Sequence, residues 1–297
     1  MTFPRTLCSL AVVTLLSGFL MTQEQGVAAE PSGLTLVIMD PLAAPLSCPC
    51  VKGYAQRNYD KLGNFLSEEL GVPVQVVYAE SLEEALDDES SGGRADIVIG
   101  KRSVVASQAK RHALSLQPEL ALTGKDGQTT QTGLIVVGAA DPAQSVKDLK
   151  GYRIIFGVSD CDEKHKAALD LLRQNGVAAP TDIETCAACS DGATTILELG
   201  PKAKAATVIS SYAAPLLEGC GTIKKGDLRV VGTTAPVPFV TAFVSEKLTP
   251  SVRMSVIAAL KEVGDEPSLL LALETKAGFV AEKSAAVAGP TAKKKGN

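Results

Sequence analysis

The chain has 297 residues, with 29 Lys and Arg against 33 Asp and Glu, a formal net charge of −4. It therefore lacks the positive field that holds nucleic acid, and its 4% aromatic content and lack of Trp leave few platforms for stacking bases. A hydrophobic share of 45% excludes a disordered chain, and the composition does not fit a coiled coil or a multi-pass membrane protein. The length fits two lobes of roughly 100–150 residues each.

The N-terminus has the pattern of a secretory signal peptide. Arg5 precedes an apolar run from Leu7 to Met21, and the small residues Val27-Ala28-Ala29 follow. This run is shorter than the ~20 residues that a membrane-spanning helix needs. We therefore expect residues 1–29 to be removed, leaving a periplasmic mature protein that does not span the membrane.

In the first half of the chain, short apolar runs alternate with helical stripes. Leu62, Phe65, Leu66 and Leu70 follow a helical spacing that Gly71 ends. Ser81 begins an acidic helix as its N-cap, with Glu84 completing a capping box. These patterns predict strands over residues 34–39, 74–78, 96–99, 114–123 and 132–138, and helices over 54–70 and 82–90.

The second half repeats this rhythm. A short helix ends at Lys150, and Asp162 begins a longer one that Gly176 ends. The patterns predict strands over residues 153–158, 205–209, 228–231 and 239–244, and helices over 162–175, 194–199, 212–217, 250–263 and 267–275. Residues 285–297 are small and polar, and we expect them to be disordered.

Strands that alternate with helices predict an α/β fold whose sheets are mostly parallel and covered on both faces. The rhythm breaks near residues 124–132 and again near 233–238. We therefore expect two Rossmann-like lobes joined by two hinge crossings. The first lobe would comprise residues 30–128 plus 239–284, and the second residues 129–238.

Several segments in this order resemble a known family. They are Tyr59-Asp60-Lys61-Leu62, Leu70-Gly71-Val72-Pro73-Val74, Gly93-Arg94-Ala95-Asp96-Ile97, the run from Ser145 to Ile154, and Pro236-Val237-Pro238-Phe239. Together they span residues 33–265 and are similar to type 2 periplasmic solute-binding proteins, in the phosphate/phosphonate branch of ABC-transporter receptors. The resemblance implies a receptor, not an enzyme, whose two lobes close on a small-molecule or ion ligand and hand it to a membrane permease.

In open α/β sheets, ligands lie beyond the carboxyl ends of the strands. The loops expected there supply the candidate ligand-binding residues Asp40, Lys101, Arg102, Ser103, Thr132, Ser159, Asp160, Asp162, Ser190, Asp191, Ser210 and Tyr212. The family's hydroxyl-rich turn falls on Ser159-Asp160-Cys161-Asp162-Glu163. Its carboxylates would each repel a bound dianion by about 1–4 kcal/mol at about 4 Å, which argues against phosphonate as the ligand, unless they complement a helix N-terminus instead.

Six cysteines follow the expected signal peptide: Cys48, Cys50, Cys161, Cys186, Cys189 and Cys220. An even number in an exported chain suggests disulfides. Alternatively, the CxC pair, the CxxC pair and the i, i+4 pair of Cys161 and His165 could bind a thiophilic ion such as Cu(I) or Zn(II). A CxxC at a helix start also suits redox exchange.

The cofactor is thus unknown, with copper or zinc as candidates, and the alternative function is a cysteine-based metal-binding or redox protein on the same fold. A sensory domain that reports to a partner protein is a third possibility. With two His residues and no nucleophile elbow, we predict no catalytic triad.

Overall fold

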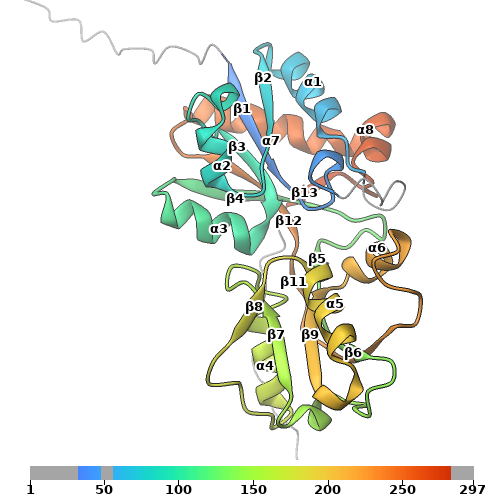
Figure 1. Ribbon diagram of the computed structural model, residues 1–297. Helices are drawn as coiled ribbons and strands as arrows, with labels where there is room; N and C mark the ends of the chain where they lie inside the picture. The colour runs from blue at the N-terminus through green and yellow to red at the C-terminus, as the bar shows by residue number, and fades with distance from the viewer. Residues whose placement is uncertain (1–32, 48–55, 282–297) are drawn as a thin grey trace, which may run out of the picture. The chain divides into compact units, whose positions relative to one another are not determined.

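The computed structural model describes residues 33–47 and 56–281 (Figure 1). The expected signal peptide, the CxC pair of Cys48 and Cys50, and the expected disordered tail lie outside the described residues. Within the described residues, no helix combines the length and the apolar composition that crossing a membrane requires.

The first sheet has six strands in the order β13-β4-β12-β3-β1-β2. Strand β1, next to the edge strand β2, runs parallel to β2 and β3, whereas β12 runs antiparallel to β3 and β4, and β13 antiparallel to β4. The strands are β1 (Leu34–Met39), β2 (Val74–Tyr78), β3 (Ile97–Lys101), β4 (Leu116–Leu122), β12 (Val240–Ser245) and β13 (Phe279–Ala281).

Both faces of the first sheet are buried, which explains why β1 is a continuous apolar run. Leu36 and Ile38 pack on one face against α1 (Tyr59–Leu70), α7 (Pro250–Glu262) and α8 (Pro267–Ala272). Val37 and Met39 pack on the opposite face, against α2 (Leu82–Asp87) and α3 (Arg102–Arg111). Figure 1 shows the two sheets with their helices. Alternate residues of one strand thus supply two separate cores.

The second sheet has five strands in the order β10-β6-β9-β7-β8. Strand β7 runs parallel to β8 and β9, and β6 runs antiparallel to β9 and β10. The strands are β6 (Gly133–Gly138), β7 (Arg153–Gly157), β8 (Glu184–Cys186), β9 (Ala205–Ser210) and β10 (Leu228–Thr233). Helix α4 (Lys166–Gln174) packs on one face, and α5 (Cys189–Leu199) and α6 (Ala213–Gly219) pack on the other.

The chain passes between the two sheets twice. It leaves the first sheet after β4 and returns to it from β10. The two connecting segments pair with each other through the short antiparallel strands β5 (Thr130–Gln131) and β11 (Val237–Pro238). The expected α/β fold with two crossings is confirmed, whereas the domain bounds stay a prediction.

The expectation of mostly parallel sheets is wrong, because both sheets are mixed. In the first sheet, β12 starts at Val240 beside Lys101, which is the last residue of β3. A strand that enters at the carboxyl end of its neighbour must run in the opposite direction. The antiparallel pairing therefore follows from the chain's return from the second sheet.

Several helix boundaries also differ from the prediction. Helix α1 begins at Tyr59 after its N-cap Asn58, and α4 begins at Lys166 instead of residue 162. Helix α5 begins at Cys189, five residues before the predicted start, and the predicted helix over 82–90 ends at Asp87 and resumes as a 3₁₀ turn. Patterning predicted neither α3 nor the strands β5, β8, β11 and β13, because α3 buries few apolar side chains and these strands are two or three residues long.

The contact between α1 and β2 gives a test of the packing. A Cβ atom at Gly63 would lie 2.3 Å from Cγ2 of Val76. We expect Gly63→Ala to lower the free energy of unfolding by about 1–3 kcal/mol through overpacking, measured by urea denaturation. The neighbouring substitution Asn64→Ala, at an exposed position of the same helix, should change it by less than about 0.5 kcal/mol. Equal effects would contradict this close packing.

Candidate functional site

A tight turn between β7 and α4, residues 161–165, carries buried polar side chains. The turn is closed by the His165 amide, which donates to the Cys161 carbonyl at 2.9 Å, and by the Gly157 amide, which donates to the Lys164 carbonyl at 3.1 Å. Two glycines let the turn press onto the second sheet. A Cβ at Gly133 would lie 2.0 Å from the Glu163 carbonyl oxygen, and one at Gly157 would lie 2.4 Å from Cβ of Lys164. Glycine is therefore required where these backbones approach.

Glu163 in this turn forms a buried ion pair with Lys101, the last residue of β3. The side chains are 0% and 8% exposed, respectively. Lys101 Nζ also donates to Cys161 Sγ at 3.2 Å, and Ser210 Oγ, at the end of β9, donates to Glu163 Oε1 at 2.6 Å. We call Lys101, Cys161, Glu163 and Ser210 the Lys101 cluster. It joins the carboxyl ends of β3, β7 and β9.

The charges of the Lys101 cluster support one another. Burial raises the pKa of Glu163, but the charge and hydrogen bond of Lys101 outweigh burial, so the pKa lies below its ordinary value. Burial lowers the pKa of Lys101, but Tyr212, Glu163 and Cys161 raise it well above its ordinary value. Burial raises the pKa of the Cys161 thiol despite the nearby ammonium. The pair is therefore ionised at neutral pH beside a protonated thiol.

An aromatic stack adjoins the Lys101 cluster. The ring of Tyr212 stacks on that of Phe239, with centroids 5.3 Å apart, and Lys101 Nζ lies 5.7 Å from the centroid of Tyr212. On the other side, Arg57 Cζ lies 5.9 Å from the centroid of Phe239. Arg57 in turn donates to the buried Asp40 at 2.8 Å. Two buried cations thus flank two stacked rings, an arrangement that ring quadrupoles favour.

A pocket of about 370 Å³ lies beside this turn, and we call it the Lys164 pocket. Lys164 is buried, and its Nζ donates to the Ala187 carbonyl at 2.9 Å. None of the ion pairs found among the described residues includes Lys164. The described residues that line the pocket include no Asp or Glu; they are Pro41, Leu46, Ser47, Lys164, Ala187, Ala188, Cys189, Ser190, Tyr212, Ala213, Leu216, Leu217, Cys220 and Thr222.

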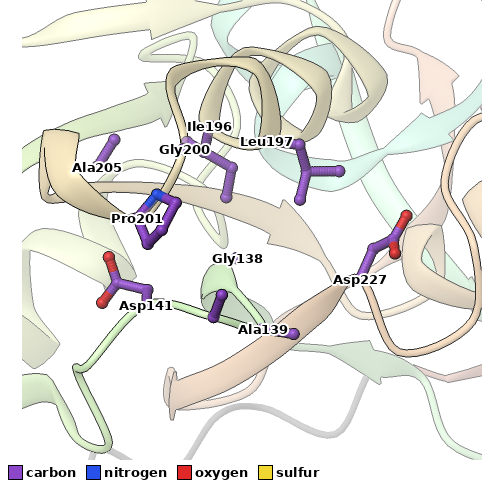
Figure 2. Close-up of a pocket in the computed structure, with 10 residues that line it drawn as sticks. Gly138, Ala139, Asp141, Ile196, Leu197, Gly200, Pro201, Ala205 and Asp227 are labelled. Carbon is purple, nitrogen blue, oxygen red and sulfur yellow. The ribbon is translucent and has the colours of Figure 1, made fainter.

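Figure 2 shows another pocket, of about 240 Å³, where β6 ends and β9 begins. Its two carboxylates already have partners. Asp141 accepts from the Tyr152 hydroxyl at 2.9 Å, and Asp227 accepts from the Lys224 amide at 2.8 Å. Its other described lining residues carry no charge. We therefore place the candidate site at the Lys164 pocket and the adjoining Lys101 cluster.

The structure brings together four of the residues singled out in the sequence: Lys101, Cys161, Ser210 and Tyr212. Ser190 and Cys189 also line the Lys164 pocket, and Asp191 follows them in the first turn of α5.

The other candidates serve separate contacts. Asp40 accepts from Arg57 and from the Tyr59 hydroxyl, and Asp160 accepts two hydrogen bonds from Arg111. Ser103 Oγ accepts from the Asp162 amide at 3.2 Å. For the remaining three, Thr132 bonds Ser211 through its backbone, Arg102 is the first residue of α3, and Ser159 is exposed in a turn.

The described cysteines Cys161, Cys186, Cys189 and Cys220 are free thiols, so disulfides stay a prediction. Cys161 and His165 lie at the two ends of the turn before α4, and their side chains contact Lys101 and the Gly157 carbonyl, respectively. Across residues 33–47 and 56–281, no group of three or more His, Cys, Asp or Glu side chains could hold a metal ion.

Sequence reasoning missed Lys164, Phe239 and Arg57, and named Glu163 without assigning it to the site. Lys164 lies between an acidic and a basic neighbour, a pattern typical of an exposed segment. Gly133 and Gly157 are the sequence features that could have indicated the close approach of this turn. Only the pairing of the strands shows that both glycines face the same turn.

Comparisons with known proteins agree with this architecture. A family model described as "ABC transporter, phosphonate, periplasmic substrate-binding protein" matches residues 53–285. The chain is similar to the solved structure of XAC2383 from Xanthomonas citri bound to chloride ion, at 18% identity and a TM-score of 0.63, over 86% of this chain and 93% of that chain. None of the curated proteins matches the chain.

Two further solved structures are similar. One is a binding protein component of an ABC phosphonate transporter from Pseudomonas aeruginosa (PA3383), at 13% identity and a TM-score of 0.62, over 86% of this chain and 82% of that chain. The other is PhnD1 from Prochlorococcus marinus in complex with methylphosphonate, at 13% identity and a TM-score of 0.60, over 86% and 94%. At these identities the likeness shows the fold, that of type 2 periplasmic binding proteins.

Removal of Lys101 tests the buried pair. We expect Lys101→Met to lower the free energy of unfolding by about 3–5 kcal/mol, because Glu163 would remain buried without its counter-ion. Arg153→Met is the matched control, since Arg153 pairs with Glu184 at the surface and such pairs contribute about 0–1 kcal/mol. Urea denaturation measures both variants. A similar loss in the two would show that the Lys101 pair is not buried in solution.

The ion pair of Lys101 and Glu163 also makes the free energy of unfolding depend on pH. Because the pKa of Glu163 is lowered in the folded chain, its stabilisation is present above the ordinary value of 4.5 and is lost as the pH falls below it. Because the pKa of Lys101 is raised in the folded chain, its stabilisation is present below pH 10.5 and is lost at higher pH. Urea denaturation from below pH 4.5 to above pH 10.5 should show a decline in acid that Glu163→Gln makes shallower. An unchanged acid slope in this variant would contradict the assignment.

Proposed function

Because the chain belongs to the periplasmic substrate-binding proteins of phosphonate-type ABC transporters, we propose that it captures a small organic anion in the Lys164 pocket and delivers it to a membrane permease. The family binds its ligands and does not transform them, so no catalytic residues are required. The observation that carries the choice of ligand is a buried ammonium in a pocket whose described lining contains no carboxylate.

The Lys164 ammonium favours an anion. Its Nζ has three donors, and Ala187 accepts one of them. A buried ammonium without a counter-ion is unfavourable, so an anionic group that enters the pocket would form a charge-assisted hydrogen bond with it. Ser190 lies in the first turn of α5, whose N-terminal amides add a partial positive charge to the same pocket.

The carboxylates expected to repel a phosphonate do not line this pocket. Asp160 is neutralised by Arg111, and Glu163 by Lys101. Asp162 lines a separate hollow beside α4. The repulsion inferred from the sequence is therefore largely offset, which supports a phosphonate-like anion as the ligand class.

The rest of the lining favours an organic anion over inorganic phosphate. Leu46, Leu216 and Leu217 contribute apolar surface, and the pocket volume of about 370 Å³ lies within the range of small-molecule sites. One of the similar structures contains methylphosphonate, an anion with an apolar substituent, which makes it a suitable first probe. We further propose that the two sheets and their helices form lobes that close on the ligand about the paired segments β5 and β11.

Lys164→Met tests the anion site. We expect it to weaken methylphosphonate binding at least about tenfold in isothermal titration calorimetry, because one charge-assisted hydrogen bond is lost. Lys166→Met, two residues on at an exposed position, should bind like the unaltered chain.

Thermal unfolding of each variant separates a loss of binding from a loss of fold. Equal affinities in the two variants would contradict the assigned site. Stoichiometric copper or zinc in natively purified protein, with no methylphosphonate binding, would support a metal-binding function instead.

A further inference from the structure

The CxxC pair forms part of the wall of the Lys164 pocket. Cys186 ends β8 and Cys189 begins α5. The two residues between them, Ala187 and Ala188, line the pocket together with Cys189. The carbonyl of Ala187 is also the acceptor for Lys164 Nζ. The two thiols therefore bracket the acceptor that holds the buried cation of the pocket.

Each thiol has a defined position in the reduced chain. Cys189 Sγ accepts from the Ser210 amide at 3.4 Å, which ties it to the end of β9. Cys186 Sγ lies beneath the first turn of α5, 3.1 Å from where a Cβ at Gly192 would stand. Both cysteines pack against the same buried cluster of the second sheet. Burial raises the pKa of the Cys186 thiol despite the nearby Lys164 ammonium.

From this arrangement we propose that Cys186 and Cys189 form a reversible disulfide that moves the Ala187 carbonyl away from Lys164 and weakens anion binding in the pocket. The inference rests on the proposed function for its ligand. A disulfide needs the two Cα atoms within about 7 Å and the Cβ atoms turned toward each other. Ala188 has an extended backbone, with φ −90° and ψ 146°, and the exposed Ala187–Ala188 segment is the part that moves as the bridge closes.

The oxidant is an external disulfide, of the kind that an oxidising compartment such as the periplasm supplies. The Cys189 thiolate attacks one sulfur of that disulfide, forms a mixed disulfide and releases one thiol. Cys186 then loses its proton, attacks Cys189 Sγ and releases the second thiol. Two protein thiols and one external disulfide thus become one internal disulfide and two external thiols.

Bridging changes the contacts of both partners in the pocket. Cys189 Sγ must turn from the Ser210 amide toward Cys186, and the segment that carries the Ala187 carbonyl moves with it. Lys164 then loses the acceptor that orients it. A cation that is no longer held in place binds an anion less tightly, because ordering it again opposes binding.

Treatment of the full mature chain with oxidised glutathione tests the proposal. We expect peptide mapping to show a Cys186–Cys189 bridge, and titration calorimetry to show methylphosphonate binding about tenfold weaker than in the reduced chain. Dithiothreitol should restore the affinity. Labelling of Lys164 by an amine-reactive reagent, read by mass spectrometry without ligand, should rise in the bridged chain.

Two variants serve as controls. Cys186→Ser should make affinity and Lys164 labelling insensitive to the oxidant, whereas Thr185→Ser, at the exposed neighbouring position of β8 outside the pocket lining, should keep the full response. A bridge between Cys189 and Cys220, or a Cys186–Cys189 bridge with unchanged affinity and labelling, would overturn the proposal. Failure of methylphosphonate to bind in either redox state contradicts the proposed ligand, while Lys164 labelling still decides whether the bridge moves the acceptor.

Discussion

A buried ammonium and a buried carboxylate hold the candidate site together. Lys101 ends β3 of the first sheet, and Glu163 lies in the turn that follows β7 of the second. Two ions withdrawn from water are stable only as partners, so each requires the other in place. Ser210 completes the arrangement by donating to Glu163, which fixes the end of β9 as well.

Lys164, which follows Glu163 in the same turn, has the opposite environment. Glu163 has a counter-ion, whereas Lys164 is bonded only to a backbone carbonyl in the described residues. The first arrangement suits a structural role, and the second suits a binding role, because the missing counter-charge can come from a ligand. The CxxC segment supplies that carbonyl, which is the basis of the proposed dependence of the pocket's affinity on the state of two thiols.

The sequence allowed a large part of the fold to be predicted. The bounds of β1 and β2 match the predicted runs, and Gly71 ends α1 in the left-handed conformation, with φ +65°. These features depend on local patterns that a single segment contains. Helix α3 and the antiparallel course of β12 depend on neighbours far away in the chain, so local patterns could not predict them.

By itself, the sequence determined the alternation of strands and helices, the two breaks in it, and the loops in which polar and sulfur-bearing residues gather. The tertiary structure decided which of those residues meet. Asp40 lies against Arg57, Asp160 against Arg111, and Lys164 against a carbonyl, although in the sequence each is simply a charged residue. The physical reason is burial: whether a charge finds a counter-ion, a carbonyl or an open pocket depends on which strands pair and where glycines let a turn approach the sheet.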